Sequence, residues 1–323
     1  MMIWYVMLLA LGMFLLVKGA DWFVDGSSKI AKALKIPSLI IGLTLVSMGT
    51  SAPEASVSIN SALNGLSDMS MGNVVGSNVF NTLFILGLSA VIAPLAISSE
   101  MKKYDIPIML GVYAVLMTFA FVCSPLRLEW WEGLVMLLLF VAYMAFLIVR
   151  AKKSGTGEST KQEAGELAAQ GSLSTPIWKS VVYAIVGLAA IIFGGDLVVD
   201  NAALIATELG MSEVLVGLTI VAVGTSLPEL VTSVVASIKK ENDIAVGNVI
   251  GSNIFNVIFI LGFSSILSPL TLAQATWVDM AVMLGSGAAV LLIALCGKNM
   301  KKWQGAVLFL AYVAYLTFII LRN

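Results

Sequence analysis

The chain has 323 residues, of which 59% are hydrophobic and 11% are charged, and its mean hydropathy is +0.99. A soluble domain carries about 25% charged residues, so this composition excludes a soluble globular protein and indicates a polytopic membrane protein. The net charge of −1 says nothing about partners, and the absence of histidine excludes imidazole metal sites and histidine proton relays.

A membrane-spanning helix needs about 20 apolar residues. This criterion predicts an all-α protein with ten spans, at residues 3–22, 37–63, 70–95, 104–124, 130–150, 177–199, 212–238, 244–269, 277–296 and 303–321. The hydrophilic segment from Lys152 to Thr175 is rich in Gly, Ser, Glu and Lys, a composition typical of a flexible linker. We therefore expect a five-helix unit over residues 1–150, a linker over 151–175 and a second five-helix unit over 176–323.

The two units repeat each other at an offset of 175 residues, without a gap from about Gly12 to Leu95. Residues 49–54 (GTSAPE) return as residues 224–229 (GTSLPE), and residues 76–81 (GSNVFN) return as residues 251–256 (GSNIFN). A weaker echo at an offset of 172 pairs Arg150 with Arg322. Because five spans are an odd number, the second unit enters the membrane the opposite way up, which predicts an inverted repeat.

The loop charges give an independent prediction of the topology. Loops that follow odd-numbered spans carry fourteen basic residues, whereas the even loops and both termini carry only Arg127 and Arg322. The fourteen are Lys29, Lys32, Lys35, Lys102, Lys103, Arg150, Lys152, Lys153, Lys161, Lys239, Lys240, Lys298, Lys301 and Lys302. Positive residues favour the cytoplasmic side, so we expect the linker in the cytoplasm and both termini outside.

Each copy of the GTSxPE motif places a glycine, a proline and a carboxylate inside a long apolar run. Proline removes a helix hydrogen bond, so each helix should break or kink there, near the membrane midplane. A carboxylate at membrane depth costs several kcal/mol unless a partner neutralises it. Lys18 is the nearby basic candidate, but its repeat equivalent is Phe193, and one lysine does not pair with both Glu54 and Glu229. Two broken helices that form a cation site explain both motifs better than structural ion pairs do.

The side chains around these breaks offer oxygen ligands. A spacing of four residues places each of four pairs on one helix face: Thr50 with Glu54, Thr225 with Glu229, Ser77 with Asn81, and Ser252 with Asn256. The breaks are also expected to free backbone carbonyls near Ser47 and Ala222. Carboxylate, amide and hydroxyl oxygens suit hard cations such as Ca²⁺ or Na⁺ and do not suit zinc or copper. Two small-xxx-small pairs, Gly72/Gly76 and Gly247/Gly251, are expected to let neighbouring helices approach closely.

Other polar residues are expected to be structural. Four aspartates near span ends are predicted to anchor helices rather than bind ions: Asp21, Asp25, Asp196 and Asp200. The two cysteines, Cys123 and Cys296, fall on opposite predicted faces of the membrane, so we interpret them as core thiols and not as a disulfide.

At the two motifs the chain resembles the cation/Ca²⁺ exchanger superfamily, and within it the Na⁺/Ca²⁺ exchanger branch of prokaryotic type. The resemblance covers both halves and implies an antiporter that works by alternating access, with the first and sixth spans sliding past the rest. It also implies ion-lining roles for Thr50, Ser51, Glu54, Ser77, Asn81, Thr225, Ser226, Glu229, Ser252 and Asn256, assisted by the carbonyls of Ser47 and Ala222. Large Ca²⁺-sensing domains occupy the central loop of animal relatives, so the short linker here implies that such regulation is absent.

One departure from the family concerns Asn256, where some relatives, including the K⁺-dependent branch, carry aspartate. The site then has two formal negative charges, and we expect transport to need no K⁺. An Asn256→Asp change is expected to favour an extra monovalent cation or a proton.

The leading hypothesis is Na⁺/Ca²⁺ exchange in the cytoplasmic membrane, without a cofactor or a nucleic-acid partner. The alternative is H⁺/Ca²⁺ exchange on the same two glutamates. A channel is less well supported, because a pair of broken helices from one chain forms no pore ring. An intramembrane serine protease would need a histidine, which the chain lacks, so we do not expect an enzyme.

Overall fold

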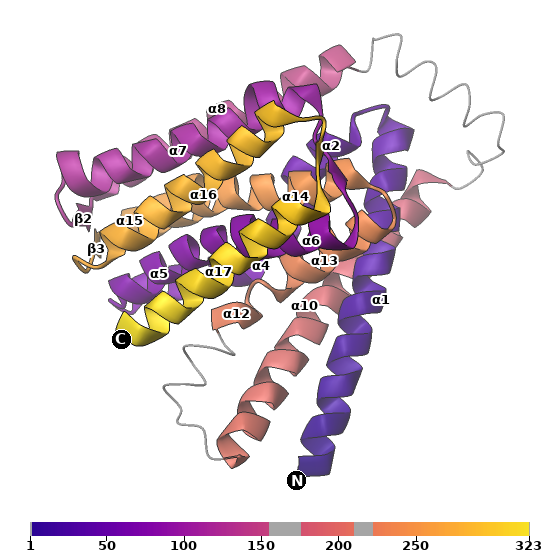
Figure 1. Ribbon diagram of the computed structural model, residues 1–323, viewed down its shortest axis with the longest axis horizontal. Coiled ribbons are helices and arrows are strands. Elements are labelled where there is room, and N and C mark those ends of the chain that lie inside the picture. The colour runs from indigo at the N-terminus through magenta and orange to yellow at the C-terminus, as the bar shows by residue number, and fades with distance from the viewer. Residues whose placement is uncertain (1, 155–175, 210–221, 323) are drawn as a thin grey trace.

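The computed structural model describes residues 2–154, 176–209 and 222–322, and these residues are almost entirely helical (Figure 1). Eight described helical segments are long and apolar enough to cross a membrane: Met2–Leu34, Ser67–Ile92, Met101–Cys123, Trp130–Lys153, Ile177–Glu208, Asn242–Leu267, Thr276–Cys296 and Lys302–Arg322. Two shorter apolar helices, Ser38–Thr50 and Leu227–Ile238, belong to the predicted second and seventh spans. Residues 212–221 of the predicted seventh span lie outside the described residues, as does most of the linker.

The first half contains these elements, with η marking π-helical turns: α1 (Met2–Leu34), α2 (Ser38–Ile41), η1 (Gly42–Val46), α3 (Ser47–Thr50), α4 (Ala52–Leu63), α5 (Ser67–Val79), η2 (Phe80–Ile85), α6 (Leu86–Ile92), β1 (Leu95–Ala96), η3 (Met101–Asp105), α7 (Ile106–Thr118), η4 (Phe119–Cys123), β2 (Arg127–Leu128) and α8 (Trp130–Ser154). The described second half contains α10 (Ile177–Glu208), α12 (Ala222–Gly224), α13 (Leu227–Ile238), α14 (Asn242–Phe255), η7 (Asn256–Leu261), α15 (Gly262–Leu267), β3 (Leu270–Thr271), α16 (Thr276–Cys296), β4 (Asn299–Met300) and α17 (Lys302–Arg322).

Helices α1 and α10 are longer than the predicted spans 3–22 and 177–199. They contain 33 and 32 residues, which corresponds to about 50 Å of helix each. The hydropathy criterion detects only apolar residues, whereas polar residues such as Lys29 and Asp200 continue the helix without breaking it. In Figure 1 the N-terminal part of α1 and the C-terminal part of α10 extend together beyond the rest of the bundle.

Glycines allow α1 and α10 to touch backbone to backbone. A Cβ on Gly12 would lie 2.8 Å from the carbonyl oxygen of Gly194, and a Cβ on Gly19 would lie 2.8 Å from that of Gly187. The later residue of α1, Gly19, meets the earlier residue of α10, Gly187, so the two helices run antiparallel. The repeat offset relates Gly12 to Gly187 and Gly19 to Gly194, so equivalent residues exchange places in this contact.

Two short strand pairs connect the halves. Strand β1 pairs antiparallel with β4, and β2 pairs antiparallel with β3. Each pair joins one connection of the first half to one of the second half, so the halves are tied together at two places outside the helices.

The helices that carry the GSNxxN motif are the most enclosed. In the most apolar window of Asn242–Leu267, 94% of the residues are buried, and in that of Ser67–Ile92 the share is 72%. The corresponding share for Met2–Leu34 is 17%, as expected for a helix with a large lipid-facing surface. The motif residues therefore occupy the centre of the bundle.

The interpretation of the cysteines as core thiols is wrong. Cys123 and Cys296 are both free thiols, as expected, but they are exposed on the surface of the bundle. They are the last residues of η4 and α16. The apolar sequence around them does not distinguish a lipid-facing position from one in the core.

The predicted anchoring role holds for two of the four aspartates. The Lys239 ammonium lies 2.6 Å from a carboxylate oxygen of Asp21 and 2.6 Å from one of Asp25. Asp196 and Asp200 are exposed and form no ion pair within the described part of the chain. The repeat equivalent of Lys239 is Asn64, a neutral residue, which explains the difference.

Candidate ion-binding site

The two GTSxPE motifs interrupt their helices as predicted. Helix α3 ends at Thr50 and α4 begins at Ala52, with Ser51 between them at φ −83° and ψ 8°. Ser226 has nearly the same conformation, φ −91° and ψ 7°, immediately before α13. Each proline falls in the first two positions of the helix after the break, where its missing N–H is not needed.

The breaks place both glutamates in the first turn of the following helix, where neither side chain is exposed. The Ser226 hydroxyl donates to Oε1 of Glu54 at 2.8 Å, and the Ser51 hydroxyl donates to Oε1 of Glu229 at 2.7 Å. Each glutamate is therefore held by the serine of the other motif. The two halves contribute equally to the centre of the molecule.

Further hydroxyl groups surround these carboxylates. The Ser226 hydroxyl lies 3.2 Å from that of Ser77. The Thr50 hydroxyl donates to Oδ1 of Asn248 at 3.0 Å, and the Ser252 hydroxyl to the backbone carbonyl of Ser47 at 3.4 Å. The predicted hydroxyls of Ser51, Ser77 and Ser226 thus lie at or next to a carboxylate, whereas those of Thr50 and Ser252 bond to neighbouring groups.

The expectation that the first break frees the Ser47 carbonyl is wrong. The backbone N–H of Ser51 donates to the Ser47 carbonyl at 3.0 Å, because the chain stays helical up to Thr50 and the break comes one residue later. The Ser252 hydroxyl also donates to this oxygen, at 3.4 Å. In the second copy the Ser226 N–H donates to the carbonyl of Val223, one residue beyond Ala222.

The two motif asparagines lie in π-helical turns on the innermost helices. Asn81 lies in η2 and Asn256 begins η7, and neither side chain is exposed. The η2 turn packs against α13, which carries Glu229, and the η7 turn packs against α4, which carries Glu54. A π-turn inserts an extra residue into a helix and is frequent at functional sites. The sequence pattern predicted the residues but not the π-turns.

Four side-chain oxygens of these residues are buried and form no hydrogen bond within the described part of the chain. They are Oε2 of Glu54, Oε2 of Glu229, Oδ1 of Asn81 and Oδ1 of Asn256. A buried acceptor without a partner costs about 1–3 kcal/mol, and more when it is charged. One oxygen from each repeat-related residue remains unpaired, and this symmetry argues that the four oxygens serve a common ligand.

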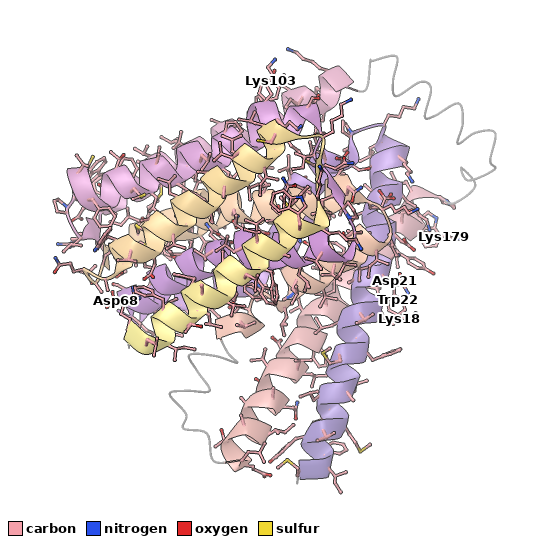
Figure 2. All side chains as sticks on the ribbon, viewed as in Figure 1. Lys18, Asp21, Trp22, Asp68, Lys103 and Lys179 are labelled. Atoms are coloured by element: carbon pink, nitrogen blue, oxygen red, sulfur yellow. The ribbon has the colours of Figure 1, made fainter. Side chains whose placement is uncertain are left out.

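A basic side chain does not fill this role among the described residues. None of the ion pairs found there involves Glu54 or Glu229. Lys18 is exposed and lies on the side of α1 away from the bundle (Figure 2). The described residues also hold no group of three acidic, cysteine or histidine residues that could bind a metal. A cation here would rely on two carboxylates and neutral oxygens, a donor set that suits Na⁺ or Ca²⁺.

Two asparagines that the sequence analysis left out of the site support the breaks. The Thr50 hydroxyl donates to Oδ1 of Asn248 at 3.0 Å, and the Thr225 hydroxyl lies 3.4 Å from Oδ1 of Asn73. The amide of Asn248 also donates to the backbone carbonyl of Glu229, and that of Asn73 to the backbone carbonyl of Glu54. Each asparagine therefore contacts the threonine of the other half and the glutamate backbone of its own half. Their signal was the repetition of Gly-Asn-Val at residues 72–74 and 247–249.

The small-residue prediction holds for the second-half pair. A Cβ on Gly247 would lie 3.0 Å from the carbonyl oxygen of Leu39, and a Cβ on Gly251 would lie 2.8 Å from that of Leu43. Gly72 and Gly76 have no described atom within 4 Å of such a Cβ. The repeat equivalents of the contacting residues, 214 and 218, lie outside the described residues.

The sequence and the fold both match known proteins. The family described as "Sodium/calcium exchanger protein" matches residues 4–149 and 179–321. A putative antiporter, CaxA of Alkalimonas amylolytica, is 38% identical over 94% of this chain and 95% of its own. The inner membrane protein YrbG of Escherichia coli is 38% identical over 81% of this chain and 79% of its own. The sodium/calcium exchanger MaX1 of Methanosarcina acetivorans is 34% identical over 96% of this chain and 97% of its own.

Among solved structures, the sodium-calcium exchanger NCX_Mj soaked with zero Na⁺ and Ca²⁺ superposes with a TM-score of 0.84 at 32% identity. The superposition covers 99% of this chain and 100% of that one. The resemblance read from the two motifs is thereby confirmed over both halves. The chain is an integral membrane protein with several spans, and it belongs to the sodium/calcium exchanger protein family.

Proposed function

We propose that this protein is a secondary antiporter that exchanges Na⁺ for Ca²⁺ by alternating access. The observation that carries the proposal is the set of four buried, unpaired oxygens on Glu54, Glu229, Asn81 and Asn256. The hydroxyls of Thr50, Ser51, Ser77, Thr225, Ser226 and Ser252 and the carbonyl of Ala222 complete the proposed ion-lining set. The names of the relatives, an antiporter and two exchangers, support transport over catalysis.

The charge of the site supports exchange between these two ions. Two carboxylates balance one Ca²⁺ or two Na⁺, so either load leaves the buried centre neutral. A centre without cations carries two adjacent negative charges, which is expensive in a medium of low dielectric constant. The protein should therefore change conformation readily only when loaded, which is the condition for obligatory exchange.

We further propose ten spans in two inverted five-helix units, over residues 1–150 and 176–323, joined by a linker at 151–175. The antiparallel contact of α1 with α10, in which repeat-related glycines exchange places, supports the inversion. The strand pairs support the topology, because each joins two connections that the charge pattern assigns to the same side. Strands β1 and β4 belong to the predicted cytoplasmic loops, and β2 and β3 to the predicted external loops.

Location in the plasma membrane, with both termini outside, completes the proposal. The name of YrbG, an inner membrane protein, supports this location. The contact of Lys32 with Glu241, at 3.8 Å, joins two loops that the lysine pattern places in the cytoplasm.

The topology predicts opposite labelling of two engineered cysteines. In a protein from which Cys123 and Cys296 have been removed, Ser159→Cys should react with an impermeant maleimide from the cytoplasmic side and Thr207→Cys from outside. Removing both native thiols is necessary because they are exposed. Reaction of both engineered residues from one side would contradict the inverted repeat.

The coupling ion is tested with purified protein in proteoliposomes. We expect an outward Na⁺ gradient to drive uptake of radiolabelled Ca²⁺, and a pH gradient of the same driving force to drive little. The alternative, H⁺/Ca²⁺ exchange, uses the same two glutamates and predicts the reverse. Uptake that follows neither gradient would contradict antiport itself.

The neutral side chain of Asn256 predicts that transport is independent of K⁺. With Glu54 and Glu229 as the carboxylates of the site, Ca²⁺ and K⁺ together would leave a buried net charge of about +1, which a membrane interior disfavours. Na⁺-driven Ca²⁺ uptake should continue when choline replaces all K⁺. Uptake that stops without K⁺ and resumes on its return would contradict the charge argument.

A further inference from the structure

We propose that Asn78 and Asn253 are positioning residues that fix which end of each site amide faces the transported cation. Asn78 orients Asn256, and Asn253 orients Asn81, so each acts across the boundary between the halves. The inference rests on the proposed function and adds residues to it that do not touch the ion. An asparagine side chain carries an acceptor oxygen and a donor NH₂ of similar size, and only the oxygen stabilises a cation.

The first relay starts from a backbone carbonyl. The carbonyl oxygen of Asn253 can only accept, and the NH₂ of Asn78 donates to it at 3.2 Å. The Oδ1 of Asn78 must then point the other way, where it accepts from the NH₂ of Asn256 at 3.1 Å. The Oδ1 of Asn256 is left facing the site, buried and unpaired.

The second relay has the same logic and one more member. The Thr82 hydroxyl donates its proton to the backbone carbonyl of Asn78 at 2.8 Å, so toward other groups it can only accept. The NH₂ of Asn253 donates to this hydroxyl at 2.8 Å, and its Oδ1 accepts from the NH₂ of Asn81 at 3.2 Å. The Oδ1 of Asn81 is again left buried and unpaired.

Two methionines secure both relays. The NH₂ of Asn78 also lies 3.7 Å from the sulfur of Met283, and that of Asn253 lies 3.6 Å from the sulfur of Met109. A thioether sulfur is a weak acceptor and not a donor. Turning either outer amide over would therefore set its oxygen against acceptors on two sides, which opposes reversal of the relay.

The relays matter because all five of these polar side chains are fully buried: Asn78, Asn81, Thr82, Asn253 and Asn256. Without water to compensate, a site amide that loses its partner can turn and present its NH₂ to the cation. Loss of such outer partners typically weakens metal affinity about 10- to 100-fold. The outer asparagines should thus set affinity for the ion more than the maximal rate of transport.

The test is a double-mutant cycle on Ca²⁺ affinity, measured by equilibrium binding of radiolabelled Ca²⁺ to the purified, Na⁺-free protein. Asn78→Leu should weaken binding by about tenfold or more in the wild-type background. In an Asn256→Ala background it should change binding by no more than about twofold, because there is no amide left to orient. In an Asn81→Ala background the full effect of Asn78→Leu should persist.

Thr82→Val provides a second cycle with a variant that is expected to fold. The repeat equivalent of Thr82 is Val257, so the fold already accommodates valine at this register. Thr82→Val should weaken Ca²⁺ binding by several-fold, and Asn81→Ala, but not Asn256→Ala, should remove that effect. Val257→Thr is the matched control, and it should leave the affinity of the wild type unchanged within about twofold.

A purely structural role for the outer asparagines predicts a different pattern. Their substitutions would then lower the melting temperature and act equally in both alanine backgrounds, and that result would overturn the proposal. If the wild type binds Ca²⁺ but the effects of the paired substitutions simply add, the relay proposal is contradicted and the proposed function is not. Absence of Ca²⁺ binding by the folded wild type contradicts the proposed function instead.

Discussion

Glu54→Gln and Glu229→Gln should each lower Na⁺-driven Ca²⁺ uptake by about a hundredfold or more while leaving the protein folded. Glutamine has nearly the shape of glutamate and keeps an oxygen that accepts from Ser226 or Ser51, so the crossed hydrogen bonds can persist. Each change removes half of the negative charge at the centre, and ligand charge tunes Ca²⁺ affinity over several orders of magnitude. The measurement is the initial rate of uptake into proteoliposomes.

Glu132→Gln is the matched control for these variants. Glu132 lies in α8, has no exposed surface, and has one carboxylate oxygen without a described partner, as Glu54 and Glu229 do. Its other oxygen accepts from the backbone N–H of Glu129 at 2.8 Å, a role that glutamine can also fill. Uptake should survive this change. Near-normal uptake by Glu54→Gln or Glu229→Gln would remove that residue from the site.

Gly187→Ala should destabilise the protein by about 1–3 kcal/mol, the usual cost of an overpacked contact. The new methyl group would lie 2.5 Å from the backbone nitrogen of Phe23 and 2.7 Å from the carbonyl of Gly19. Because these are backbone atoms, relief requires α1 and α10 to separate. Chemical unfolding in detergent measures the loss of stability, and Ca²⁺ uptake should fall with it if the helices move as a pair.

Gly195→Ala is the control for this prediction. It makes the same substitution on the same helix, but its methyl group would lie 4.0 Å from the ends of the Leu16 and Pro228 side chains, an ordinary contact. Its stability should stay close to that of the wild type. Helix propensity favours alanine over glycine and would stabilise both variants, so equal destabilisation by Gly187→Ala and Gly195→Ala would contradict the close approach of α1 and α10 as the cause.

The sequence was most informative where a residue is costly in its surroundings. Pro53 and Pro228 cannot continue a helix, so the position of each break followed from local chemistry, and both breaks are present. Repetition then added what one copy alone does not provide. A single buried glutamate is compatible with an ion pair, but two at equivalent positions with one lysine nearby are not.

The sequence was least informative where the partner comes from far along the chain. Arg150 pairs with Asp105 and Glu100 at 2.5 and 2.6 Å, and Arg322 pairs with Asp279 at 3.0 Å. The sequence shows that Arg322 repeats Arg150. It does not show their aspartate partners, which lie more than 40 residues away from each arginine and repeat at an offset slightly different from that of the arginines. The periodicity of a sequence predicts which face of a helix is apolar. It does not predict which residues of other helices contact that helix.

The crossed serine–glutamate bonds make the centre of this molecule an isologous interface contained within one chain. Ser51 meets Glu229 as Ser226 meets Glu54, so each half presents the same patch to the other, as subunits do across a two-fold axis. Neither half holds a complete set of partners for its own glutamate. In the organisation proposed above, each five-helix unit corresponds to one protomer of a dimer, and the proposed linker would keep the two units at equal number and high effective concentration.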